Sequence, residues 1–160
     1  TVYFAAIMKA RRVHSFEPQA HLIDVIKKTL ELNQIDNVTL HQAVAGAKLG
    51  KAHLKRTHAE NSGMAEFRPG AGDLPVDMLP VDDVVGEEHV TGVKIDVEGM
   101  QMPVLRGMSK TIRRCAPVLW LELRPAKGEI EQPSEWLAKR GYRRQQISFR
   151  DFLFIPETSA

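Results

Sequence analysis

The sequence has little of what marks secreted, membrane-spanning or metal-clustering proteins. Its 160 residues include one cysteine, Cys115, so no disulfide can form within the chain and a thiolate metal cluster is not expected. No apolar run approaches the roughly 20 residues of a membrane-spanning helix, and the chain opens with no signal-peptide pattern. These absences predict a protein of the reducing cytoplasm, cytoplasmic in location and without a membrane span.

Excess charge of one sign is scarce too. The formal net charge is +2, and the short basic pairs stand near the ends of predicted helices or the starts of strands, where most of them complement a helix dipole. No aromatic and basic signature accompanies them, so nucleic acid is not an expected partner. The six histidines form no i, i+4 pair, and the GxSxG elbow of serine hydrolases is absent. We therefore predict neither a metal site nor a serine nucleophile.

What is present is a regular alternation of strand and helix patterns. The apolar spacing predicts, in chain order, a strand near 13–16, a helix at 18–33, a strand near 37–46, a short edge strand and a helical turn within 76–86, a strand at 92–97, a helix at 100–115, a strand at 118–123, a helix at 132–140, and a final strand pair at 143–149 and 151–156. Trp120 and Trp136 are expected in the core. Such alternation predicts one α/β domain over residues 1–160, with a doubly wound, mostly parallel sheet and a C-terminal antiparallel hairpin.

The stretch VKIDVEGM, residues 93–100, carries three charges on an otherwise apolar strand. Side chains at i and i+2 share a face, so Lys94 and Asp96 can pair. Charges on a buried strand need partners or a function. Asp96 and Glu98 could form a general base pair, hold a substrate hydroxyl or bind a metal. Alternatively, Asp96 offsets Lys94 and Glu98 caps the helix that follows Gly99.

Other predicted strands also end in polar residues. Glu17 follows the first strand, Gln42 the second, and Glu122 stands near the end of the strand at 118–123. Open α/β sheets bind ligands outside the carboxyl ends of their strands, which makes these residues candidates for one site. The two oxygens of Glu17 suit the vicinal diol of a ribose, or they cap the helix that begins near Pro18.

Five segments in this order resemble the FkbM-type methyltransferases: RVHSFEPQ, LELNQIDNVTLHQAVAG, VDMLPVDDVV, VKIDVEGMQMPVLRGM and APVLWLEL. The resemblance runs from about Val2 to Pro156. It implies the doubly wound, Rossmann-like methyltransferase fold and S-adenosylmethionine as cofactor. It also implies O-methylation of a sugar, a glycan or another small hydroxyl acceptor.

The resemblance implies two overlapping groups of site residues. Those that bind the cofactor would be Glu17 on the ribose hydroxyls, Gln42 and Ala43 beside the adenine, and Asp96 near the sulfonium. The catalytic residues, near the acceptor hydroxyl, would be Asp96, Glu98 and Glu122. A family loop that contains Ser and Gly near the pocket would fall at Asn61, Ser62 and Gly63.

One part of the family pattern has no counterpart in the sequence. The first strand and its Gly-rich loop, Asp-x-Gly-x-x-x-Gly, would stand immediately before Thr1. Without this strand a hole would open between neighbouring strands, which a packed core does not tolerate well. We therefore expect an N-terminally incomplete domain, and a protein that is longer than these residues.

Two other functions stay open at this stage. An acid after a strand is also the ribose ligand of NAD-dependent oxidoreductases. A non-catalytic relative could use the same fold as a binding module. The block containing Asp96 and Glu98, together with the terminal hairpin, favours the methyltransferase. The residues leave open which carboxylate takes the proton, which acceptor binds, and the oligomeric state.

Overall fold

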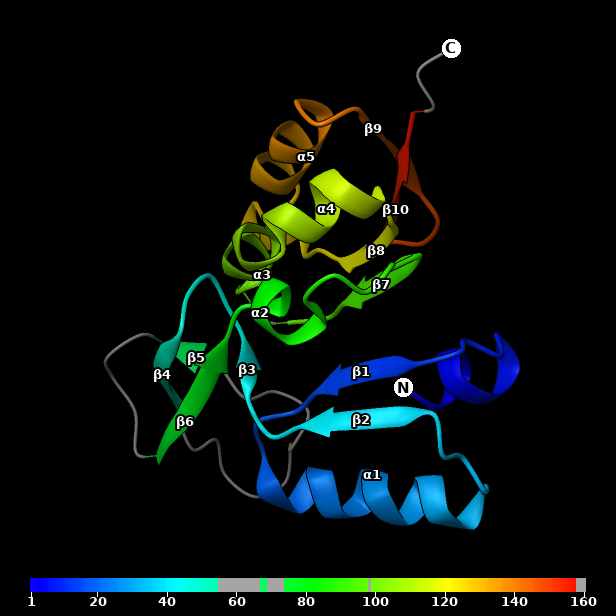
Figure 1. The fold of residues 1–160 in the computed structure, drawn as a ribbon. Coiled ribbons are helices and arrows are strands. Elements are labelled where there is room, and N and C mark those ends of the chain that lie inside the picture. The colour runs from blue at the N-terminus through cyan, green and yellow to red at the C-terminus, as the bar shows by residue number, and fades with distance from the viewer. Residues whose placement is uncertain (55–66, 69–73, 98, 158–160) are drawn as a thin grey trace.

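The computed structural model describes residues 1–54, 67–68, 74–97 and 99–157, and Figure 1 shows how their strands and helices are arranged. Within these ranges the strands form three sheets, and the α/β class predicted from the sequence is confirmed. None of the helices in the described ranges has the length and apolar character needed to cross a bilayer.

The N-terminal part is a strand–helix–strand unit. A short π-helix, η1 (Tyr3–Ile7), leads into β1 (Val13–Phe16), and α1 (Ala20–Leu32) connects β1 to β2 (Val38–His41). The two strands are parallel and in register from Val13 opposite Val38 to Phe16 opposite His41. Helix α1 runs along this strand pair in Figure 1, as a crossover helix must. Both strand ends therefore deliver Glu17 and Gln42 to the same edge.

A small second sheet follows at once. It contains β3 (Val44–Ala45), β4 (Gly50–Leu54), β5 (Phe67–Arg68) and β6 (Leu74–Leu79), in the order β3-β6-β4-β5. The single strand predicted over 37–46 is wrong in this detail, because the chain turns at Gln42, where the N–H of Ala43 donates to the carbonyl of His41 at 2.9 Å. The turn sends β2 and β3 into different sheets.

The C-terminal half forms the third sheet and its helices. In chain order it consists of α2 (Val81–Val85), β7 (Gly92–Ile95), α3 (Gln101–Gly107), α4 (Ser109–Cys115), β8 (Val118–Glu122), the short η2 (Pro125–Lys127), α5 (Glu131–Ala138), β9 (Tyr142–Gln146) and β10 (Asp151–Pro156). The strand order is β7-β8-β10-β9, with β7 and β8 parallel and the last two strands antiparallel. The predicted C-terminal hairpin is confirmed.

The main core lies between this third sheet and helices α3, α4 and α5, which cover one of its faces in Figure 1. Leu119 and Leu121 of β8 alternate with Trp120 and Glu122, so the apolar pair faces the helices and the other pair faces away. Each fully buried leucine contributes roughly 1.5–3 kcal/mol through burial. The helices thus fix one face of the sheet and leave the other for polar side chains.

Side chains connect the strand pair β1–β2 to the third sheet. Within the described residues no strand pairing joins β1 to β7. Instead Glu88, in the connection before β7, accepts from Arg12 at 2.7 Å and lies 3.5 Å from the ring nitrogen Nε2 of His14. The arrowheads of β1, β2 and β7 point the same way in Figure 1, so their carboxyl ends lie at one edge.

Candidate active site

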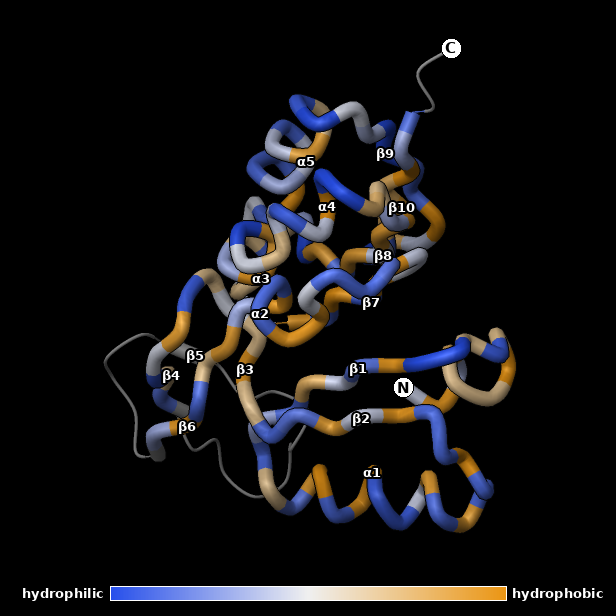
Figure 2. Tube along the Cα trace, in the orientation of Figure 1, coloured by the Kyte–Doolittle hydropathy of each residue, from blue (hydrophilic) through white to orange (hydrophobic). Residues whose placement is uncertain are grey.

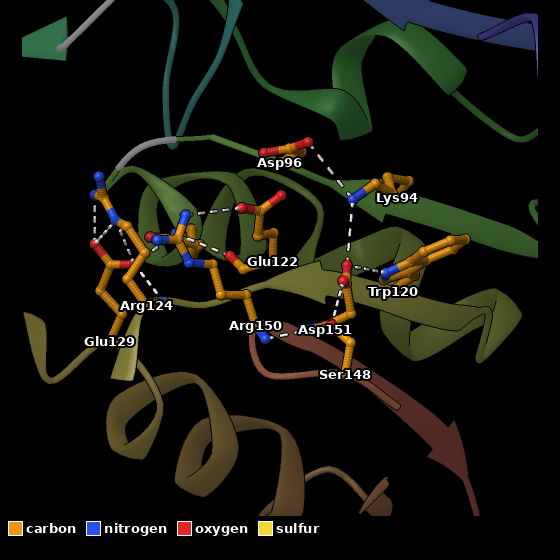
Figure 3. Close-up of polar contacts among 10 residues, drawn as sticks. Lys94, Asp96, Trp120, Glu122, Arg124, Glu129, Ser148, Arg150 and Asp151 are labelled. Carbon is orange, nitrogen blue, oxygen red and sulfur yellow. Dashed lines mark hydrogen bonds and ion pairs between the residues drawn. The ribbon is translucent and has the colours of Figure 1, made fainter. Parts of the chain in front are cut away.

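Three carboxylates form a row across neighbouring strands of the third sheet. Ile95 pairs with Leu121, so Asp96, the first residue after β7, lies beside Glu122 at the end of β8. On the other side of Glu122, β10 places Asp151 directly opposite. Figure 3 shows these side chains together on the face that the helices leave open. The register thus brings together Asp96 and Glu122, two of the predicted catalytic residues.

Asp96 and Glu122 interact as a pair. Burial is the largest cause that raises the pKa of Glu122 above its ordinary value, and the charge of Asp96 and a hydrogen bond with that carboxyl group add to it. Two carboxyl groups can share a hydrogen bond when one of them carries the proton. The side chain of Asp96 is 57% exposed, against 31% for Glu122. Glu122 is thus the member suited to hold a proton, and Asp96 is the more accessible carboxyl group of the two.

The predicted pairing of Lys94 with Asp96 is confirmed. The Lys94 Nζ lies 3.5 Å from Asp96 Oδ2. The lysine is 28% exposed, and its ammonium also lies over the ring of Trp120, 4.8 Å from the centroid. The structural alternative therefore holds for two of the three charges of this stretch, because Lys94 offsets Asp96.

Asp151 is held by several donors. The indole Nε1 of Trp120 donates to Oδ1 at 2.7 Å, and the hydroxyl of Ser148 donates to Oδ2 at 2.6 Å. These hydrogen bonds, from Ser148 first and then Trp120, hold the pKa of Asp151 below its ordinary value. Trp120 was expected in the core, but it is half-buried and orients Asp151 instead. Trp136 does pack against the core.

A second polar network lies next to this row and was not predicted. Arg124, two residues after Glu122, forms an ion pair with Glu129 at 2.5 Å, with side chains 17% and 12% exposed. Gln101, the first residue of α3, donates to the carbonyl of Glu122 at 3.2 Å and to Glu129 at 3.3 Å. The network ties the end of β8 to the start of α3, and so supports the carboxyl ends of β7 and β8.

The predicted cofactor residues gather at the ends of β1 and β2. Glu17 is half-buried, and its Oε1 accepts from the backbone N–H of Gln19 at 2.8 Å. Glu17 is therefore not the N-cap of α1, which begins at Ala20 with Gln19 as its N-cap; its hydrogen bond lies in the turn before the helix. Gln42 is exposed, whereas Ala43 is 2% exposed and its backbone N–H donates to the carbonyl of His41.

Some predicted residues lie outside the described ranges: Glu98, Asn61, Ser62 and Gly63. Their predicted roles stay predictions. Among the residues that the structure describes, no group of three or more histidine, cysteine, aspartate or glutamate side chains is arranged to hold a metal ion.

Sequence reasoning missed Lys94 as a contact of Trp120, and it missed Asp151 and Arg150. Arg150 lies in the turn before β10, 28 positions after Glu122 in the sequence, and Asp151 is the first residue of β10, 29 positions after Glu122. The register that places Asp151 opposite Glu122 depends on the hairpin geometry, which spacing alone does not supply. The sequence signal that could have pointed there is the tight turn SFRD between two short strands.

The sequence model of one protein family, the methyltransferase FkbM domain, matches residues 1–144 of this chain. The chain belongs to the FkbM methyltransferase family.

Two further proteins are similar to this chain, one in fold and one in sequence. The crystal structure of methyltransferase FkbM from Methylobacillus flagellatus KT is similar in fold, with a TM-score of 0.64 at 17% identity, over 90% of this chain and 36% of that one. The chain thus spans about a third of that structure. Methyltransferase 1 of Beauveria bassiana (strain ARSEF 2860) is 23% identical over 166 residues, which is 89% of this chain and 67% of that protein.

Proposed function

We propose that this FkbM-family protein transfers a methyl group from S-adenosylmethionine to a hydroxyl oxygen of a sugar, a glycan or another small acceptor. The observation that supports the proposal best is the carboxyl pair of Asp96 and Glu122 at the carboxyl ends of β7 and β8. A hydroxyl acceptor loses a proton as it is methylated, and a carboxylate in this position can take it. A cytoplasmic location stays a prediction that rests on the single cysteine.

The residues at the ends of β1 and β2 fit a nucleoside cofactor. The hydrogen bond from Gln19 orients the Glu17 carboxylate, and carboxylate oxygens can accept from the two hydroxyls of a ribose. The backbone of the turn at Gln42 and Ala43 lies beside Glu17 in the register, since Phe16 pairs with His41. The negative charge of Asp96 suits a ligand with a positively charged sulfur.

When bound, S-adenosylmethionine would supply a methyl group already activated by the sulfonium. The chain would then position the acceptor and receive its proton. Asp96 is the carboxylate suited to accept that proton at Oδ1 or Oδ2. Glu122, which holds a proton more readily, would orient an acceptor oxygen by donating a hydrogen bond. The role predicted for Glu98 is compatible with this division but lies outside the described residues.

Isothermal titration calorimetry with S-adenosylhomocysteine and with NAD tests the cofactor. We expect the wild-type protein to bind S-adenosylhomocysteine and not NAD. The Glu17→Gln variant should bind it at least about tenfold more weakly, because it loses a charged acceptor of hydrogen bonds. Asp24→Asn, an exposed position on α1, is the matched control and should bind normally.

Each other outcome has a definite meaning. Binding of NAD with no binding of S-adenosylhomocysteine would show an oxidoreductase instead. Binding of neither ligand would contradict the cofactor assignment. Equal binding by Glu17→Gln and the wild type would remove Glu17 from the proposed ribose site while leaving the enzyme class in place.

A further inference from the structure

The Lys94 side chain lies among residues of three neighbouring strands, β7, β8 and β10. Lys94 pairs with Trp120 in the β7–β8 register, and Trp120 pairs with Leu153 of β10. The Lys94 ammonium lies 3.5 Å from Asp96 Oδ2, 3.7 Å from Asp151 Oδ1 and 4.8 Å from the centroid of the Trp120 ring. Figure 3 shows Lys94 above the indole, with a carboxylate on either side. A flexible side chain is thus confined to one place.

The residues that contact Lys94 are themselves held by hydrogen bonds. Asp151 Oδ1, which faces Lys94, also accepts from the Trp120 indole, while Oδ2 accepts from Ser148. The Ser148 hydroxyl in turn accepts from the backbone N–H groups of Asp151 and Arg150, at 3.1 and 3.3 Å. The turn between β9 and β10 therefore orients the Asp151 carboxylate. That carboxylate in turn contacts both the Trp120 indole and the Lys94 ammonium.

The charges of the row are unequally compensated. Asp151 has the hydrogen bonds just described, and Asp96 has Lys94 at 3.5 Å. Glu122 has Arg150 at 3.9 Å, with the arginine side chain 55% exposed, so that this contact is weak in water. The positive charge of Lys94 opposes the effects of burial and of Asp96, and so limits how far the pKa of Glu122 is raised.

We propose that Lys94 is a positioning residue, held by Trp120 and Asp151, whose ammonium orients Asp96 and offsets the negative charge of the Asp96–Glu122 pair. The inference rests on the proposed function, because it assigns Asp96 the role of proton acceptor in methyl transfer. Lys94 acts through Asp96 and does not need to touch the acceptor. The hairpin turn at Ser148 thereby becomes part of the catalytic support.

Several charged groups face this lysine. They come from the end of β7, from β8 and from β10: Asp96, Glu122 and Asp151. Lys94 pulls the pKa of Glu122 down against burial and Asp96. Removal of the Lys94 charge should therefore move the protonation of the pair in a known direction.

Carbon-13 NMR of the glutamate and aspartate carboxyl groups measures this directly. In Lys94→Met, we expect the Glu122 titration midpoint to rise by about one pH unit, the size of effect that a nearby opposite charge has. Lys94→Arg keeps the charge and should restore a midpoint close to the wild-type one. Lys51→Met removes an exposed lysine that pairs with Asp77 at 2.6 Å, and it should leave Glu122 unchanged.

Equal midpoints in the wild type and Lys94→Met would overturn the proposal, and so would an equal rise in Lys94→Met and Lys94→Arg, which would indicate packing instead of charge. If Lys94→Met does not fold, the wild-type protein still gives an answer. The Lys94 ¹⁵Nζ resonance should then titrate with the same midpoint as Glu122, and a flat curve would contradict the inference.

These readouts need neither methyl donor nor acceptor. Failure of S-adenosylhomocysteine binding would therefore overturn the proposed function without changing the NMR result. Normal methyl transfer with an unresponsive Glu122 would overturn the role of Lys94 alone.

Discussion

At the scale of single residues, Asp96 and Glu122 have the same chemistry in different surroundings. Asp96 is more exposed and contacts Lys94, whereas burial and Asp96 raise the pKa of Glu122. We expect Asp96→Asn to lower methyl transfer by about 100-fold or more, because the proton acceptor is lost while the shape is kept. Transfer of a radiolabelled methyl group to a panel of sugars and other hydroxyl compounds measures it.

Asp83→Asn, at an exposed position on α2, is the control for this experiment and should keep wild-type activity. S-adenosylhomocysteine binding should persist in Asp96→Asn, which separates loss of chemistry from loss of the cofactor. An Asp96→Asn protein that transfers methyl groups at the wild-type rate would show that Asp96 is not the proton acceptor.

What the sequence could predict at this scale depended on distance along the chain. Lys94 and Asp96 are two residues apart in one strand, so their pairing follows from strand geometry. Trp120 and Asp151 are brought together by the β8–β10 register, and their hydrogen bond could not be predicted from spacing. Trp120 was expected in the core, whereas the alternation of β8 turns its ring to the face opposite Leu119 and Leu121.

At the scale of the elements, the predicted helix over 100–115 is divided into α3 and α4 around Met108. Val104, Leu105, Met108 and Ile112 are nevertheless all buried, as their spacing predicts. In α1, by contrast, the buried side chains are Ile23 and Leu30. Val25 and Leu32 each stand two residues after one of these, roughly 200° around the helix at about 100° per residue, so they lie on its opposite, exposed side. Figure 2 shows polar and apolar residues alternating along α1.

Gly107, at the end of α3, gives a sharp test of how the elements pack. A Cβ added there would collide with the backbone carbonyl of Gly46 and come within 3.3 Å of the Ala47 Cα. Backbone atoms cannot move aside as a flexible side chain can. We therefore expect Gly107→Ala to lower the free energy of unfolding by about 3 kcal/mol, the upper part of the usual range for overpacking. Urea denaturation followed by circular dichroism measures this.

The matched control is Gly92→Ala, in β7, where the nearest atom to an added Cβ is the Val118 carbonyl oxygen at 3.8 Å. This is an ordinary contact, and the control should lie within about 0.5 kcal/mol of the wild type. A Gly107→Ala protein as stable as Gly92→Ala would mean that α3 does not pack against the connection at Gly46 as the structure has it.

At the scale of the whole molecule, the strand pair β1–β2 is joined to the third sheet by polar and aromatic side chains. His14 of β1 lies 3.0 Å from His41 of β2 between ring nitrogens, and Phe16 stacks on His41 at 4.9 Å. His14 also lies 3.5 Å from Glu88, which belongs to the connection before β7 of the third sheet. Alternation predicted the separate strands and helices, but such a contact depends on how whole sheets are placed, which no local pattern specifies.

This arrangement makes stability depend on pH in a definite direction. Burial, and then the charge of His14, lower the pKa of His41 below its ordinary value of 6.5. The unfolded chain then binds more protons than the folded chain in the window below about 6.5. Unfolding free energy should therefore fall as the pH drops from about 7 to about 5. The pKa of Glu88 is also lowered, because hydrogen bonds from Arg12 and His14 outweigh its burial, but that effect is lost at pH values below its usual 4.5.

His41→Gln removes the titrating ring, so we expect its unfolding free energy to change less over this window than that of the wild type. His21→Gln, at an exposed position of α1, is the control and should keep the wild-type slope. Urea denaturation at a series of pH values measures both. If His41→Gln keeps the full wild-type slope, acid sensitivity must come from other groups, and the histidine contact between β1 and β2 does not control how firmly this strand pair is held.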